Sequence, residues 1–160
     1  MLDSSFIESA YGCERVGISG NKRAKGNNIS IAVDKNGDAL AVSVNPANMA
    51  DSVAAQPLIV CVKELFGTIK RVLADSAYDR TEFKALLDEM GLDLDTTSPP
   101  LPKGTNFVPR PVRWVVEQYF GWLTRWRRIG KNYCYKAQRF TDEVRWCVFA
   151  TAMKRATSSV

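Results

Sequence analysis

Two apolar stretches on either side of a tight turn place the strongest constraint on how this chain can fold. Ile29–Asp34 and Ala39–Val44 alternate in character, and the segment Asp34-Lys-Asn-Gly-Asp38 between them has the composition of a hairpin turn. We therefore expect an antiparallel hairpin in the first third of the chain. A short strand over Met1–Ile7 is expected to precede it.

Helical and extended patterns alternate after this hairpin. Asp51 and Asp79 stand where helices favour an N-cap, and Gly67 and Gly91 stand where the same helices are expected to end. A short apolar run, Arg71-Val-Leu-Ala-Asp75, separates the two helices. Three further elements are expected: an edge strand over 92–96, a long helix from about Val112 to Ile129, and a last helix capped by Thr141 that ends near Arg155.

This order of elements predicts an α/β fold. A strand, a hairpin and then alternating helices and strands are typical of a mixed sheet flanked by helices in three layers. The chain of 160 residues has an ordinary composition for one domain, and no linker divides it. We expect a single domain over residues 1–160, with residues 156–160 as a frayed tail.

The composition excludes several classes of site. The sequence contains no histidine, which removes Ser-His-Asp and Cys-His catalysis and every histidine-ligated metal site. The four cysteines form no C-x-x-C pair, and no apolar run reaches the length of a membrane span. We expect a cytoplasmic protein whose polar chemistry depends mainly on carboxylates. Carboxylate oxygens are natural ligands of hard cations such as Mg²⁺.

Charge is distributed unevenly along the sequence. Residues 1–100 carry a net charge of −4, whereas residues 101–160 carry +9, which gives the overall +5. A basic region of this kind favours a polyanionic partner such as nucleic acid. The candidate phosphate contacts are Arg113, Arg125, Arg127, Arg128 and Lys131, with a second group formed by Lys22, Arg23 and Lys25.

Most acidic residues have an adequate structural explanation, and three do not. Asp34 and Asp38 suit the hairpin turn. Asp75 ends an apolar strand, and its alternative role is that of a turn residue. Asp3 lies in the first strand, where the alternative is a solvated acid near the terminus. Glu117 lies in the middle of the long helix, where the alternative is an exposed residue paired with Arg113.

Five motifs in order resemble the catalytic domain of DDE transposases from bacterial insertion sequences, in the group without a large insertion before the glutamate. The similarity covers almost the whole chain. It is carried by Asp3-Ser-Ser, by Lys22-Arg-Ala-Lys-Gly26 with Val33-Asp-Lys-Asn-Gly37, by Pro46-Ala-Asn48 with Asp51, by Leu73-Ala-Asp-Ser-Ala-Tyr-Asp79, and by Arg113-Trp-Val-Val-Glu117 with Phe120-Gly-Trp-Leu123.

The resemblance implies an RNase H-like fold and a catalytic triad of Asp3, Asp75 and Glu117. These acids would bind two Mg²⁺ ions, for which Mn²⁺ can substitute, and the enzyme would hydrolyse a phosphodiester and transfer a DNA strand. Three carboxylates repel one another without a counter-charge, so the site is expected to be incomplete until metal and phosphate arrive. The implied partners are double-stranded DNA as transposon ends and target, and further copies of the chain assembled on that DNA at the nucleoid.

The sequence departs from the family pattern in two places. In the signature Tyr-x2-Arg-x3-Glu-x6-Lys, Arg113 and Glu117 match, whereas Arg110 and Thr124 stand at the Tyr and Lys positions. Arg125 or Arg128 can take the place of the lysine. Relatives carry a helical DNA-recognition region before the first aspartate, where this sequence has only Met1 and Leu2. We therefore expect a truncated copy or a product that works with an upstream reading frame.

Two other functions fit the same residues, beside a third alternative in which the chain is a purely structural protein that binds neither metal nor DNA. One is a DNA-binding remnant of a transposase, a truncated chain that no longer catalyses strand transfer. The other is a different RNase H-like nuclease that acts on branched or hybrid nucleic acid. Cleavage of an artificial nicked or terminal substrate would distinguish an active enzyme from the remnant. Substrate preference would distinguish a transposase from the other nuclease.

Overall fold

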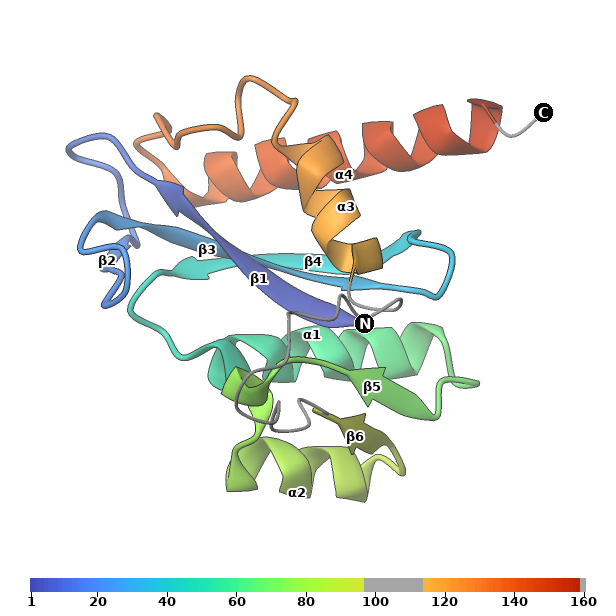
Figure 1. Cartoon of the computed structure of the whole chain (residues 1–160). Coiled ribbons are helices and arrows are strands. Elements are labelled where there is room, and N and C mark those ends of the chain that lie inside the picture. The colour runs from blue at the N-terminus through green and yellow to red at the C-terminus, as the bar shows by residue number, and fades with distance from the viewer. Residues whose placement is uncertain (97–113, 159–160) are drawn as a thin grey trace, which may run out of the picture.

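An antiparallel sheet built around one long strand forms the centre of the fold (Figure 1). The computed structural model describes residues 1–96 and 114–158. The central strand is β3 (Lys25–Val33), and β1 (Leu2–Glu8) pairs with it from Leu2↔Ala32 to Glu8↔Gly26. Two more strands pair with β3: β4 (Ala39–Pro46) and the short β2 (Gly17–Ile18).

The predicted hairpin turn is confirmed between β3 and β4. The Asp34 carboxylate accepts hydrogen bonds from the backbone N–H groups of Asn36 (2.8 Å) and Asp38 (2.9 Å). Gly37 has a φ of +82°, a conformation that an L side chain rarely adopts. Asp38 also pairs with Arg155 at 3.1 Å. Both aspartates therefore have the structural roles expected of turn residues.

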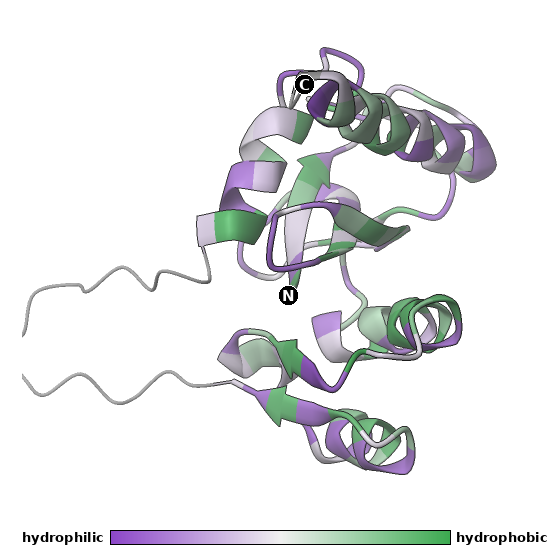
Figure 2. Cartoon of the chain, turned by 90° about the vertical axis from the view of Figure 1, so that its right-hand side faces the viewer, coloured by the Kyte–Doolittle hydropathy of each residue, from purple (hydrophilic) through white to green (hydrophobic). Residues whose placement is uncertain are grey.

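Helices cover both faces of this sheet, and strand alternation decides which residues face which helix. Leu2 and Ala32 pack into a core with Leu58 of α1 (Asp51–Leu65). Ile31 and Val33 point to the other face, where they pack against α3 (Trp114–Leu123). The last helix, α4 (Ala137–Ser158), lies on this second face beside α3, as both views show (Figures 1 and 2).

A second, parallel pair of strands lies on the α1 side of the molecule (Figure 2). It consists of β5 (Arg71–Leu73) and β6 (Asp93–Asp95), connected by the 3-10 helix η1 (Ser76–Tyr78) and by α2 (Thr81–Glu89). The edge strand expected over 92–96 is β6. Within the two described ranges, β5 makes no ladder with β1, so the strands form two hydrogen-bonded sheets.

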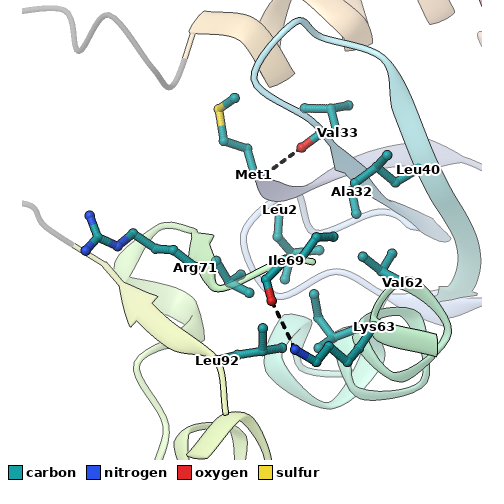
Figure 3. Close-up of a pocket in the computed structure, with 12 residues that line it drawn as sticks. Met1, Leu2, Ala32, Val33, Leu40, Val62, Lys63, Ile69, Arg71 and Leu92 are labelled. Carbon is teal, nitrogen blue, oxygen red and sulfur yellow. Dashed lines mark hydrogen bonds between the residues drawn. The ribbon is translucent and has the colours of Figure 1, made fainter. Parts of the chain in front are cut away.

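The seam between the two sheets is closed mainly by apolar side chains (Figure 3). Leu2, Ile69 and Val72 line a cavity of about 30 Å³ there, together with aliphatic residues of α1. The Lys63 ammonium crosses this region to donate to the carbonyl of Ile69 at 3.0 Å. The cavity has room for about one or two water molecules and for no larger ligand.

Several predicted helix boundaries are wrong. Ala50 and Arg80 occupy the N-cap positions of α1 and α2, and no side chain caps either helix, so Asp51 and Asp79 do not cap them. Asp79 pairs with Lys84 instead. Thr141 lies inside α4 and donates back to the Ala137 carbonyl at 3.1 Å.

The ends of the last two helices also differ from the prediction. The long helix ends at Leu123, because the chain turns between Thr124 and Gly130. The predicted start at Val112 lies outside the described residues. The last helix continues to Ser158, so the frayed tail expected from residue 156 is helical in its first part.

Candidate active site

Asp3 is positioned by the first strand of the sheet. It lies opposite Ile31 in the β1–β3 register, and directly opposed residues of an antiparallel pair share a face. The side chain is half-buried, and one of its oxygens accepts the backbone N–H of Ser4 at 2.8 Å. Asp3 is therefore part of the ordered sheet and not a frayed terminal acid.

Asp75 follows β5 directly and begins η1. Its carboxylate accepts the backbone N–H of Ala77 at 2.8 Å, which makes it the N-cap of this short helix. The carboxylate is half-buried. Asp75 therefore has the turn role that the sequence suggested as its alternative. The hydrogen bond fixes the orientation of the carboxylate, whose second oxygen is a further acceptor.

A buried tyrosine links these two acids, although 72 positions of sequence separate them. Tyr78 ends η1 and is only 1% exposed. Burial raises the pKa of its hydroxyl, and the negative charges of Asp51, Asp3 and Asp75 raise it further. The charges of three carboxylates from three parts of the chain therefore raise the pKa of the same tyrosine hydroxyl. The hydroxyl completes no hydrogen bond within the described residues, although the nearby Ser4 side chain slightly opposes the rise in pKa.

Asp51 belongs to this acidic region, which sequence reasoning did not foresee. Its carboxylate points to the sheet, where it accepts hydrogen bonds from Ser4 Oγ (2.7 Å) and Asn28 Nδ2 (3.3 Å). It connects the start of α1 to β1 and β3. The available signal was the sequence motif Pro46-Ala-Asn48 with Asp51, one of the five described above.

Glu117 lies in the first turn of α3 and is exposed. The adjacent Val116 packs with Ile31 and Val33, so α3 crosses the sheet face onto which Asp3 projects. One turn beyond Glu117, a Cβ added to Gly121 would meet nothing within 4 Å. Among the described residues, therefore, nothing fills the space beside Gly121.

The three predicted acids do not form a closed metal cage. Across residues 1–96 and 114–158, no three His, Cys, Asp or Glu side chains lie close enough together to hold an ion. Asp3 and Asp75 both lie near the Tyr78 hydroxyl, whereas Glu117 is held on a separate helix. Carboxylate oxygens are the donors that hard divalent cations prefer, so the chemistry of this set fits Mg²⁺ or Mn²⁺.

The predicted basic residues fall into two exposed groups. Arg125, Arg127 and Arg128 follow α3 and are exposed, and Arg128 pairs with Glu143 at 2.9 Å. Lys131 is half-buried and pairs with Glu8 at 2.6 Å. The second group, Lys22, Arg23 and Lys25, is exposed in and after the turn that leads into β3. Arg110 and Arg113 lie outside the described residues.

Comparison with known proteins identifies the family. The sequence matches the family described as "Transposase DDE domain" over residues 1–153. The structure is similar to the catalytic core domain of BIV integrase in crystal form I, with a TM-score of 0.51 and 12% sequence identity over 92% of this chain and 79% of that chain. At this identity the likeness shows the fold, which is RNase H-like. No curated protein gave a match.

Proposed function

Because the chain belongs to the transposase DDE domain family, a class of polynucleotidyl transferases, we propose that Asp3, Asp75 and Glu117 are the catalytic acids of a metal-dependent DNA strand-transfer reaction. The observation that supports this proposal is that Asp3 on β1 and Asp75 after β5 both lie close enough to the buried Tyr78 for their charges to raise the pKa of its hydroxyl. The two acids are remote in sequence, and β1 and the end of β5 carry them. The family match favours this function over the other RNase H-like nucleases.

The separation of Glu117 from the two aspartates has an electrostatic reason. Three carboxylates at coordination distance repel one another without a cation between them. The helix that carries Glu117 packs through Val116 and Tyr119 on the sheet that carries Asp3, so the two acids belong to adjacent elements. We propose that binding of metal and DNA draws the three acids together.

Each part of the chain has a distinct task in this reaction. Bound divalent ions would activate the attacking oxygen and neutralise charge on the phosphate. Backbone N–H groups of Ser4 and Ala77 hold the carboxylates of Asp3 and Asp75 in fixed orientations. Water would attack the phosphorus, leaving a 5′ phosphate on one side of the cut and a 3′ hydroxyl on the other. This 3′ hydroxyl would then attack a phosphodiester of target DNA, forming a new phosphodiester and releasing the target's own 3′ hydroxyl.

The basic groups are proposed to hold the DNA backbone. Exposed arginines suit this task because the guanidinium matches the geometry of a phosphate. The first group follows the helix that carries Glu117, and the second precedes the central strand or, for Lys25, begins it. Double-stranded transposon ends and target DNA are the proposed partners, with several copies of the chain assembled on them at the nucleoid. No helix in the described ranges is long and apolar enough to cross a membrane.

A nicking assay tests the proposed acids. Purified protein would be incubated with supercoiled plasmid and with a nicked duplex in Mg²⁺, in Mn²⁺ and in chelator. We expect metal-dependent cleavage by the wild type, and a loss of at least about a hundredfold in Asp3→Asn, Asp75→Asn and Glu117→Gln, since removal of one electrostatic catalytic group costs roughly 10² to 10³.

Two further measurements make this assay decisive. Asp88→Asn is the matched control, because Asp88 is an exposed acid on α2, and it should cleave at the wild-type rate. The three active-site variants should bind DNA with affinity close to that of the wild type. A variant that retains wild-type cleavage removes its residue from the proposed triad, and a wild type that binds DNA without cleaving it supports a non-catalytic remnant.

A further inference from the structure

An open cleft lies between the segment that connects α3 to α4 and the first turns of α4, near Glu8 at the end of β1 opposite to Asp3. Its volume is about 430 Å³, within the range of small-ligand sites. The lining includes four cationic and two aromatic side chains: Arg128, Lys131, Lys136, Arg139, Tyr133 and Tyr135.

The two tyrosine rings are unusual in their exposure. Tyr133 is 74% exposed and Tyr135 is 64% exposed, although aromatic side chains of this size normally bury most of their surface. Between them Cys134 is half-buried and before them Asn132 is buried, so the extended segment alternates in and out. Both rings are consequently presented on its outer side.

This segment is held firmly by its backbone. The N–H of Asn132 donates to the Glu8 carbonyl (2.8 Å), and its carbonyl accepts the N–H of Ala10 (2.7 Å). The Tyr135 carbonyl accepts the N–H of Glu14 at 2.9 Å. The side chain of Asn132 also donates to Asn27 Oδ1 at 2.9 Å and is buried. The segment that carries the two rings is therefore fixed to the sheet by hydrogen bonds.

The cations of the cleft are available to an anionic ligand. Arg128 and Arg139 share Glu143, at 2.9 Å and 3.9 Å, and Lys136 pairs with Glu14 at 2.8 Å. The side chains of all three cations are about 70% exposed, at 73%, 74% and 69%. Ion pairs at such exposure are weak, so a phosphate can replace the carboxylate. The N-terminus of α4 begins at Ala137 beside them and adds its positive end.

We propose that this cleft binds unpaired DNA, with a base stacked on Tyr133 or Tyr135 and its phosphates held by Arg128, Lys136 and Arg139. Exposed rings among exposed cations are the combination by which proteins bind single strands without reading sequence. The proposal rests on the proposed function, because it takes DNA as the substrate, and it adds the strand state and the place of binding.

The sheet sets the distance between this cleft and the candidate active site. Asp3 and Glu8 are five residues apart on β1, which corresponds to about 17 Å along the strand. Glu8 pairs with Lys131, which lines the cleft. A strand of DNA that reaches from one to the other would span roughly five nucleotides at 3.4 Å each. The cleft is thus placed to hold a strand that has separated from its complement beyond the cut.

Fluorescence anisotropy tests the subsite without catalysis. The probes are a labelled blunt duplex and the same duplex with an unpaired tail of about ten nucleotides, measured with the whole chain in chelator. We expect the tail to tighten binding by roughly five- to 150-fold, the range for stacking of one base on an aromatic ring. The double variant Tyr133→Ala/Tyr135→Ala should lose most of this gain.

Two variants distinguish stacking from other causes. The double variant Tyr133→Phe/Tyr135→Phe retains the rings and should retain most of the gain. Phe149→Ala removes an exposed aromatic side chain of α4 outside the cleft and should leave the gain unchanged. The blunt duplex reports in each case whether the protein is still folded and able to bind DNA.

Two results would overturn the subsite. One is a tail that gives no gain with the wild type, which would leave the cleft as a plain basic surface. The other is a gain that persists in the double alanine variant. Either result is independent of the nicking assay, since the chain can cleave DNA without this cleft, and it can bind a tail without a functional metal site.

Discussion

Asp75 has a structural and a proposed catalytic role in the same side chain. It caps η1 through the N–H of Ala77, and its charge contributes to the acidic region around Tyr78. The two roles depend on different properties, because a cap needs a hydrogen-bond acceptor and metal binding needs a charged carboxylate. Different substitutions can therefore separate them.

The free energies of unfolding of two Asp75 variants distinguish the capping role from the role of the charge. Asp75→Asn keeps an acceptor and should change the free energy of unfolding by less than about 0.5 kcal/mol, whereas Asp75→Ala should lower it by about 1 kcal/mol, since Asn and Asp are similar caps and Ala is a poor one. Urea unfolding measures both. Equal loss in the two variants would mean that the charge, and not the cap, stabilises this position.

Tyr119 predicts how stability depends on alkaline pH. It is fully buried on the face of α3 that packs against the sheet, its hydroxyl donates to the Val148 carbonyl at 3.3 Å, and burial raises its pKa to about 12. An unfolded tyrosine ionises near pH 10. The folded state therefore binds the proton more tightly, and stability should be full below pH 10 and should fall as pH rises toward 12.

Tyr119→Phe tests this dependence. The variant should show a smaller loss of thermal stability between about pH 10 and pH 12 than the wild type, measured by circular dichroism. Tyr78 also has a raised pKa, so part of the alkaline loss should remain in the variant. Identical pH profiles for wild type and variant would contradict the assignment to Tyr119.

At the level of elements, Asn132 joins the α3–α4 connection to the sheet. Its side chain donates to Asn27 Oδ1 and accepts the N–H of Cys134 at 2.8 Å, and Asn27 in turn donates to the Arg15 carbonyl at 3.0 Å. The residue is 1% exposed. A buried polar network of this kind holds several segments in one arrangement.

Removal of this side chain should be costly. Asn132→Ala leaves Asn27 and the Cys134 N–H without their partner, and we expect the free energy of unfolding to fall by about 2–4 kcal/mol. Gln138→Ala serves as the control, because Gln138 is exposed on α4 and should change stability by less than about 0.5 kcal/mol. A small effect of Asn132→Ala in denaturant unfolding would show that the backbone contacts alone hold the connection.

The elements most visible in the sequence are those that local chemistry determines. The Asp34–Asp38 turn and its two strands were predicted correctly, because alternation and turn residues act over a few positions. The position of Asp51 at a helix start did not reveal its partners, since Ser4 and Asn28 lie on distant strands. The end of α3 at Leu123 was missed because helix-compatible residues continue to Arg128 while tertiary packing bends the chain.

The candidate site was only partly visible for the same reason. Asp3, Asp75 and Glu117 were predicted because local roles explained them less well than the other acids, and because the motifs that resemble the DDE family contain all three. Tyr78 and Asp51 have ordinary local explanations, and their place beside Asp3 depends on how α1 and η1 pack against the sheet. Such long-range placement cannot be obtained from periodicity.

For the molecule as a whole, the exposed cations predict a steep dependence of DNA binding on salt. If at least four of the described basic residues contact phosphates, affinity should fall roughly a hundredfold or more between 50 and 200 mM salt, because each contact releases counterions. Arg127→Ala should reduce the slope by about one, and Lys84→Ala on α2 should leave it unchanged. An affinity that stays flat with salt would exclude a phosphate-binding surface.

The central claim concerns the metal, and an anomalous diffraction map from crystals grown with Mn²⁺ and a DNA end tests it most directly. We predict a manganese peak at about 2.0–2.4 Å from carboxylate oxygens of both Asp3 and Asp75, with Glu117 moved toward the same site. A well-ordered map that shows manganese bound elsewhere, or no manganese beside these two aspartates, would contradict the account.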